Sequence, residues 1–111
     1  MSENVGFAGQ IGPEHVTQVL EKGFKSIINN RPDMEGGPEQ PTSAQIEEAA
    51  RIAGLDYVYQ PVVAGQITEM DVRTFANNFN ELPKPVLMFC RTGNRSNNLY
   101  QLAKQMDLLE D

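Results

Sequence analysis

The segment from Val86 to Ser96 constrains the fold more than any other part of the chain. Four apolar residues, Val86 to Phe89, lead directly into Cys90, which is the only cysteine of the protein. A short polar loop with one glycine follows, and a helical pattern begins behind it. A buried strand that ends in such a loop brings backbone N–H groups and a helix N-terminus around the cysteine. The segment therefore predicts an anion-binding loop with a nucleophile at its base.

The residues of this loop are expected to hold a negatively charged substrate. Arg91 and Arg95 place two positive charges within five residues of Cys90 and favour its reactive thiolate form. A lone cysteine after an apolar strand is more often a small buried hydrophobic residue. The arginines, the glycine and the following serine favour a site instead. Cys90 and Arg95 are the predicted catalytic residues, and the predicted anion-binding residues are Arg91, Thr92, Gly93, Asn94 and Ser96.

The composition narrows the class of protein. A length of 111 residues suffices for one hydrophobic core, so residues 1–111 are expected to form a single domain. The net charge of −6 argues against nucleic acid as a partner, because nucleic acids select basic surfaces. One Cys and one His cannot supply a zinc site, so we expect neither a metal nor a cofactor.

The sequence shows no targeting signal. The first residues lack a basic region followed by an apolar run, which is the pattern of a signal peptide. No apolar stretch approaches the roughly 18 residues that cross a membrane. A thiolate cysteine also suits a reducing compartment. We therefore expect a cytoplasmic protein that makes no contact with a membrane.

Strand and helix patterns alternate along the whole chain. Strands are expected over residues 5–9, 24–29, 55–63 and 86–89. Helices are expected to begin near Pro13, at Thr42, at Thr68 and at Ser96 or Asn97. This order predicts an α/β fold with a mostly parallel central sheet of about four strands flanked by helices.

The loop behind the second strand is expected to lie near Cys90. Loops that follow parallel strands gather at the carboxyl edge of the sheet, where ligands bind. Arg31 and Asp33 are therefore auxiliary candidates that would face Cys90 across a pocket. Asn, Pro, Asp and Gly also form surface turns for backbone reasons alone. Both interpretations of this loop remain open.

The spacing of Cys90 and Arg95 resembles the active-site loop of rhodanese-type sulfurtransferases, in which the cysteine carries a persulfide. The related cysteine-dependent phosphatases place a histidine before the cysteine and use a loop one residue longer. In this chain Phe89 stands at the position of that histidine. A tighter loop fits a single sulfur better than a tetrahedral phosphoryl group.

Motifs along the whole chain resemble the phosphatase-like domain of β-lactamase-hydrolase-like proteins. They lie at residues 28–33, 40–43, 61–68 and 90–96, and the resemblance runs from about residue 5 to residue 106. It implies a dual-specificity-phosphatase-like fold. Members of this family occur alone or beside sulfide-metabolising domains. The resemblance therefore implies partners among sulfide-metabolism enzymes, and either sulfur transfer or phosphatase chemistry.

Three hypotheses follow. The first is a sulfurtransferase that carries a persulfide on Cys90 and passes it to a thiol. The second is a phosphatase-like hydrolase that forms a phosphocysteine on Cys90, with Asp33 as a remote acid. Such a phosphatase needs an aspartate to protonate the leaving oxygen, and residues 58–65, where it is expected, contain no carboxylate. The third is a non-catalytic anion-binding module. The ligand is a small anion, either a sulfane-sulfur donor or a phosphate ester.

Overall fold

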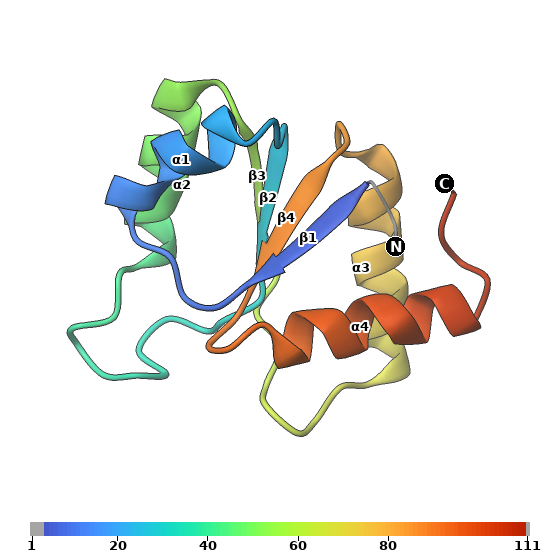
Figure 1. Cartoon of the computed structure of the whole chain (residues 1–111). Coiled ribbons are helices and arrows are strands. Elements are labelled where there is room, and N and C mark those ends of the chain that lie inside the picture. Colours follow the sequence, from blue (N-terminus) through green and yellow to red (C-terminus); the bar gives the residue numbers. More distant parts are fainter. Residues whose placement is uncertain (1–3, 111) are drawn as a thin grey trace.

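The computed structural model describes residues 4–110, which fold around a four-stranded sheet (Figure 1). The strands are β1 (Val5–Ala8), β2 (Ser26–Asn29), β3 (Asp56–Tyr59) and β4 (Val86–Phe89). Their order across the sheet is β1-β4-β2-β3, and every neighbouring pair is parallel. The predicted α/β fold with a parallel sheet of about four strands is confirmed.

Helices cover both faces of the sheet. Each connection between parallel strands must return the chain to the end of the sheet where the strands begin, and such crossovers usually contain a helix. A 3₁₀ turn, η1 (Pro13–His15), leads into α1 (Val16–Glu21), and α1 lies with α2 (Ser43–Ala53) on one face. The helices α3 (Glu69–Glu81) and α4 (Asn94–Gln105) lie on the other face (Figure 1).

Two apolar cores result, one on each face of the sheet. Side chains alternate along a strand, so Ile27 packs toward α1 and α2, whereas Ile28 packs toward α3 and α4. In β4, Leu87 and Phe89 face the first core and Met88 faces the second. Burial on both sides explains why β4 is apolar throughout instead of alternating with polar residues.

The starts of α2 and α3 agree with the sequence pattern. The N–H of Gln45 donates to Thr42 Oγ1 at 3.2 Å, and the N–H of Thr42 donates to Gln45 Oε1 at 3.0 Å. Thr68 and Asp71 form the same reciprocal pair, at 3.1 and 3.0 Å. Each capping box satisfies two backbone N–H groups that would otherwise lack a partner. Asp71 is therefore a capping residue, as the pattern predicts.

Several predicted boundaries are wrong. The first strand ends at Ala8 instead of residue 9, and the second and third begin at Ser26 and Asp56 instead of residues 24 and 55. The third strand ends at Tyr59 instead of residue 63, because its register with β2 shifts there. The N–H of Gln60 donates to the carbonyl of Asn29 at 2.9 Å, but the N–H of Val62, two residues on, donates to the next carbonyl, that of Asn30, at 3.0 Å.

The last helix begins at Asn94 instead of Ser96 or Asn97. Gly93 serves as its N-cap with a φ of 95°, in the left-handed region that glycine tolerates. The first turn of α4 therefore lies directly behind the cysteine loop.

Candidate functional site

The site forms where β2 and β4 end, at the carboxyl edge of the sheet. These strands are paired in register up to Asn29 and Phe89, and the N–H of Asn30 donates to the carbonyl of Phe89 at 2.8 Å. Cys90 follows Phe89 directly, and only 1% of its surface is exposed. The pairing therefore brings Asn30 and Cys90 to the same end of the sheet.

Backbone N–H groups surround the sulfur of Cys90. The N–H of Gly93 donates to Cys90 Sγ at 3.1 Å. Burial alone would raise the pKa of Cys90, but hydrogen bonds from the N–H groups of Ser96, Thr92 and Gly93 outweigh it. The pKa of Cys90 is consequently lowered, with a further contribution from the Ser96 hydroxyl.

The Ser96 hydroxyl has only one proton to donate, and in this structure it donates it to Asn30 Oδ1 at 2.9 Å. The backbone N–H groups therefore carry most of the stabilisation of the thiolate. Asn30 in turn donates from Nδ2 to the carbonyl of Gln60 at 3.0 Å. Ser96 and Asn30 thus join the first turn of α4 to the ends of β2 and β3.

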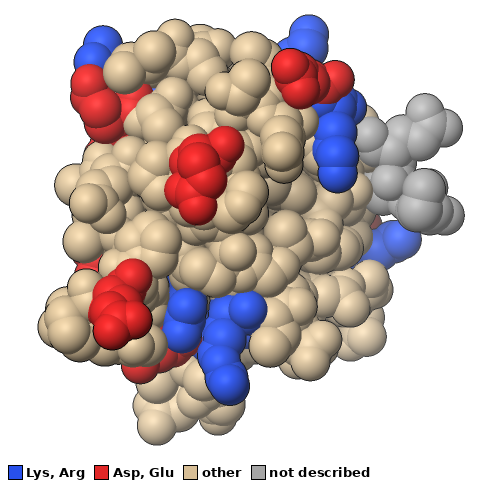
Figure 2. All heavy atoms as spheres, turned by 60° about the vertical axis from the view of Figure 1, so that its left-hand side comes forward, with Lys and Arg blue, Asp and Glu red and all other residues tan. Residues whose placement is uncertain are grey.

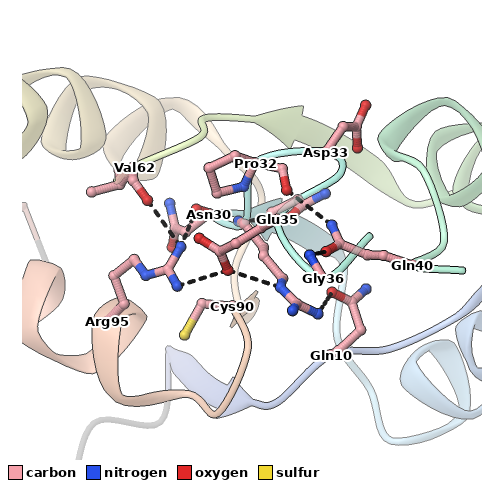
Figure 3. Close-up of polar contacts among 12 residues, drawn as sticks. Gln10, Asn30, Pro32, Asp33, Glu35, Gly36, Gln40, Val62, Cys90 and Arg95 are labelled. Carbon is pink, nitrogen blue, oxygen red and sulfur yellow. Dashed lines mark hydrogen bonds and ion pairs between the residues drawn. The ribbon is translucent and has the colours of Figure 1, made fainter. Parts of the chain in front are cut away.

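Arg95 is fixed at the mouth of the loop by three acceptors (Figure 3). Its Nη1 donates to the carbonyl of Val62 at 2.9 Å and to that of Asn30 at 3.4 Å. Its Nη2 donates to Glu35 Oε1 at 3.0 Å. The Arg95 side chain is 9% exposed and lines the same pocket as Cys90. The guanidinium is thus held in one place beside the thiolate.

Glu35 completes this arrangement, although no local sequence pattern identifies it as a site residue. Its Oε1 accepts from Arg31 Nε at 2.9 Å as well as from Arg95, so one carboxylate joins two arginines. Burial would raise the pKa of Glu35, but the two guanidinium groups lower it overall. Glu35 lies in a Gly- and Pro-rich loop without periodicity, so only the folded arrangement reveals its partners.

The auxiliary candidates Arg31 and Asp33 both make hydrogen bonds to residues other than Cys90. Arg31 is buried and contacts two neighbours of the site: it pairs with Glu35 and donates from Nη1 to Gln10 Oε1 at 3.1 Å, while the N–H of Gln10 donates to the carbonyl of Arg91 at 3.2 Å. Asp33 Oδ1 accepts from the N–H of Ser43 at 2.8 Å, at the start of α2. Figure 3 shows the Asp33 carboxylate turned away from Cys90. Asp33 is occupied as a helix cap.

A pocket of about 680 Å³ opens from Cys90 along α4. Among the residues described, its lining contains no carboxylate and no imidazole. The predicted residues Arg91, Thr92 and Asn94 line it, whereas Gly93 and Ser96 lie buried beneath it. The complete lining is Ala64, Gly65, Ile67, Cys90, Arg91, Thr92, Asn94, Arg95, Asn98, Gln101, Leu102 and Gln105.

Sequence reasoning missed both walls of this pocket. Residues 64–67 belong to the motif at residues 61–68 but were not predicted to line the site, and neither were Asn98, Gln101 and Gln105. The helical period counted from Asn94 would have placed these three on the side of the cysteine loop.

Residues 4–110 contain neither a metal-binding cluster nor a membrane-spanning helix. No group of three or more His, Cys, Asp or Glu side chains there is arranged to hold a metal ion. None of the helices in this range is long and apolar enough to span a membrane.

Comparison with known proteins identifies the family. The model for the "Beta-lactamase hydrolase-like protein, phosphatase-like domain" matches residues 1–107. The chain belongs to this family. A β-lactamase hydrolase-like protein of Agrobacterium fabrum is 40% identical over 107 residues, which are 96% of this chain and 25% of that protein. The chain thus spans about a quarter of the length of the curated relatives that it matches.

Solved structures show the same fold. A Neisseria meningitidis protein described as a proposed phosphatase is 34% identical with a TM-score of 0.87, over 96% of this chain and 75% of that one. A Cys-to-Ser variant of P. aeruginosa TpbA, solved with phosphotyrosine, is 18% identical with a TM-score of 0.64, over 95% of this chain and 62% of that one. The family predicted from the motifs is confirmed, as is the cysteine-dependent phosphatase fold. These relatives support the phosphatase-like hypothesis better than the sulfurtransferase.

Proposed function

We propose that this domain is a thiolate enzyme that transfers sulfur through a persulfide on Cys90. In this proposal the N–H groups of Thr92, Gly93 and Ser96 hold the sulfur anion. Arg95 and Arg91 bind the charged part of a sulfane-sulfur donor. The observation that carries the proposal is that the described residues lining the pocket include no carboxyl or imidazole group that could act as a general acid.

The presence or absence of a general acid distinguishes the phosphatase from the sulfurtransferase, because the two reactions release different leaving groups. A phosphomonoester releases an alkoxide, which needs a general acid within hydrogen-bond reach. Asp33 caps α2, and Glu35 is shared by two arginines that lower its pKa and keep it ionised. Neither carboxyl group is placed to supply a proton. A sulfite leaving group does not require one.

The loading step conserves atoms and charge. The Cys90 thiolate attacks the outer sulfur of thiosulfate, a new S–S bond forms, and the old S–S bond breaks with its electron pair on sulfite. The persulfide anion remains in the field of the loop N–H groups and the first turn of α4. A thiolate acceptor then takes the outer sulfur and restores the Cys90 thiolate.

A phosphatase is the second candidate, and the kinship of the chain favours it. The solved relative at 34% identity is described as a proposed phosphatase. In this alternative Cys90 forms a phosphocysteine, Arg95 binds the phosphoryl oxygens, and a substrate with a good leaving group compensates for the missing acid. Partners in sulfide metabolism and a cytoplasmic location stay predictions under either candidate.

The intact mass of the reduced protein after incubation with thiosulfate tests the proposal. We expect the mass to increase by one sulfur atom and to return to its starting value after addition of a thiol. Cys90→Ser is the control and should gain nothing. An unchanged wild-type mass, together with turnover of a phosphomonoester, would reject sulfur transfer in favour of the phosphatase.

A further inference from the structure

The strand β1 has an open side, because it forms an edge of the sheet and pairs only with β4 (Figure 1). The carbonyl of Ala8 accepts from the N–H of Cys90 at 3.4 Å, so Ala8 turns its backbone groups toward β4. Successive residues of a strand alternate in this respect, and Val5 and Phe7 therefore turn theirs away. The open side of β1 thus presents hydrogen-bond donors and acceptors to a further strand.

The two edges of the sheet differ in their protection against such pairing. Natural edge strands carry charged side chains or prolines that discourage the addition of another strand. The opposite edge, β3, has the exposed Asp56 at its start and Pro61 two residues beyond its end. β1 consists only of uncharged residues, Val5–Ala8, and contains no proline. Of the two edges, β1 is the one suited to accept a strand.

A groove of about 550 Å³ lies between the open side of β1 and one face of α1. It exists because the two β1 residues on the α1 face of the sheet, Gly6 and Ala8, are small. The larger Val5 and Phe7 turn to the other face, where the Phe7 ring lies 5.6 Å from that of Tyr100 between centroids. The four residues of β1 span about 13 Å, the length of a short peptide in extended form.

The lining of the groove combines apolar and polar side chains. Val19, Phe24 and Leu87 form an apolar floor. Along η1 and α1, polar residues follow at intervals of three and four positions: His15, Gln18 and Lys22. Lys22 is the only fully charged residue among the described lining residues, and no carboxylate within residues 4–110 forms an ion pair with it. The groove is therefore locally positive in a chain with a net charge of −6.

An extended peptide matches each of these features. Its backbone can pair with Val5 and Phe7 as an added strand, which is how sheet edges bind peptides. Every second side chain would then face α1, where apolar groups fit Val19 and Phe24 and a carboxylate fits Lys22. We propose that this groove docks an extended segment of a partner protein, with apolar residues at alternate positions and an acidic residue next in that alternation.

The position of Lys22 gives the direction of the segment. The helix α1 leads from the carboxyl end of β1 to the start of β2, so Lys22 lies beside the amino end of β1. Antiparallel pairing is the more stable arrangement per residue. In that orientation the acidic residue is the last one of the docked segment.

The groove is separate from the Cys90 pocket but borders the same loop. Within residues 4–110 the two have no lining residue in common. Gln10, which lines the groove, donates its N–H to the carbonyl of Arg91 at 3.2 Å. A docked segment therefore holds the partner protein beside the Cys90 loop without entering the pocket, whichever reaction Cys90 performs.

NMR titration with the peptide acetyl-Val-Thr-Val-Thr-Asp-amide tests the docking site. We expect the backbone N–H resonances of Val5 and Phe7 to shift downfield in a saturable way and to exchange more slowly with water. The N–H of Tyr59, which points away from β2 at the opposite edge, is the control and should stay in place. An absence of saturable shifts in β1, or equal shifts at Tyr59, would overturn the inference.

The role of Lys22 is tested with a second peptide in which asparagine replaces the aspartate. The wild type should bind this peptide about threefold more weakly, as the loss of an exposed ion pair predicts. Lys22→Met should bind the two peptides equally. Lys25→Met, which removes an exposed lysine outside the groove, is the matched control and should keep the threefold difference. The same difference in Lys22→Met as in the wild type would refute the acidic position.

Two further analogues test the strand pairing, one with N-methyl groups on both valines and one with them on both threonines. Only one of these sets of N–H groups faces β1, so one analogue should lose binding and the other should keep it. An equal effect of the two would rule out an added strand. Sedimentation of the free protein tests the alternative occupant: a monomer supports the proposal, whereas a dimer with Val5 and Phe7 already protected would assign the edge to a second copy and overturn it.

Discussion

Cys90 combines deep burial with a lowered pKa, two properties that usually oppose each other. Burial in an apolar site disfavours a thiolate, as it does any charge. Here the N–H groups of Thr92, Gly93 and Ser96 converge on the sulfur and lower the pKa of Cys90 by more than burial raises it. A buried structural cysteine would gain nothing from such an arrangement, so the contacts of Cys90 favour a reactive role.

This arrangement predicts the pH dependence of Cys90 alkylation. Because its pKa is lowered in the folded protein, the rate with iodoacetamide should reach half its plateau at a lower pH than in the urea-unfolded chain. Reaction rates measured across the pH range in both states test this prediction. Equal midpoints would mean that the loop does not stabilise the thiolate.

Glu35 should contribute a pH-dependent part of the stability. Its pKa is lowered below 4.5, so its contribution is complete above that pH and is lost as the pH falls through the native value. Glu35→Gln leaves the two nearly buried arginines without their carboxylate. Because Glu35 itself is exposed and water screens its charge, the free energy of unfolding at pH 7 should fall by only about 1 kcal/mol.

Urea unfolding at pH 7 and at pH 3 measures this effect. The difference between the wild type and Glu35→Gln should shrink at the lower pH. Glu39→Gln, in the same loop and exposed to solvent, is the control and should change little at either pH. A difference that stays constant with pH would contradict the ionic role of Glu35.

At the scale of single residues, the sequence reveals only what is close in the chain. Cys90 and Arg95 share one loop, so their spacing alone predicts that they act together. Glu35 is sixty positions away from Arg95. No local pattern links the two, because their contact depends on how the loop after β2 folds back over the loop after β4.

At the scale of elements, the turn at Gly93 joins β4 to α4 and shapes the loop. Gly93 has a φ of 95°, and a Cβ there would lie 3.4 Å from the carbonyl oxygen of Ala8. Gly93→Ala should therefore destabilise the fold by about 1–2 kcal/mol and displace the N–H groups that hold the sulfur. We expect slower alkylation of Cys90 at neutral pH.

Gly37→Ala provides a control with the same backbone strain. Gly37 also has a φ of 95°, but a Cβ there would meet no atom within 4 Å. Both variants should lose stability in thermal unfolding, while only Gly93→Ala should slow alkylation. Equal effects on alkylation would show that the conformation of Gly93 is unimportant for the site.

Element boundaries were predictable where a side chain marks them. The capping boxes at Thr42 and Thr68 are local hydrogen bonds with a residue signature, and both are present. The early start of α4 depends on the left-handed Gly93, which carries no capping side chain. The end of β3 depends on pairing with β2, which the chain segment itself does not encode.

At the scale of the whole molecule, the parallel topology explains why distant segments form one site. The loops after β2 and β4 must lie at the same edge, whatever their sequences, because the strands are parallel neighbours. The alternation of strand and helix patterns was enough to predict this edge. Which loop residues point into the pocket depends on packing that the pattern does not contain.

The distribution of charge favours a small anion over a polyanion. The chain has a net charge of −6, and on the face shown in Figure 2 basic side chains lie beside acidic ones in small groups that uncharged surface separates. A polyanion would find no continuous basic surface on that face. A small anion beside Arg95 would meet positive charge together with the N–H groups of the loop.

Anion binding should therefore stabilise the whole fold through Arg95. A ligand that binds only the native state at ten times its dissociation constant adds about 1.4 kcal/mol. Sulfate should raise the melting temperature of the wild type and of Cys90→Ser, because the loop N–H groups and Arg95 remain in both. Arg95→Ala should lose most of this increase.

Sulfate also stabilises proteins in general, because it is excluded from their surfaces. Arg51→Ala accounts for this contribution, since it removes an arginine that is paired with Glu48 on the exposed face of α2. Sulfate should raise the melting temperature of Arg95→Ala less than that of Arg51→Ala. The difference between the two increases measures the anion binding that depends on Arg95. If the two variants respond equally, Arg95 serves only to hold Glu35 and Val62, and the loop N–H groups alone must bind the anion.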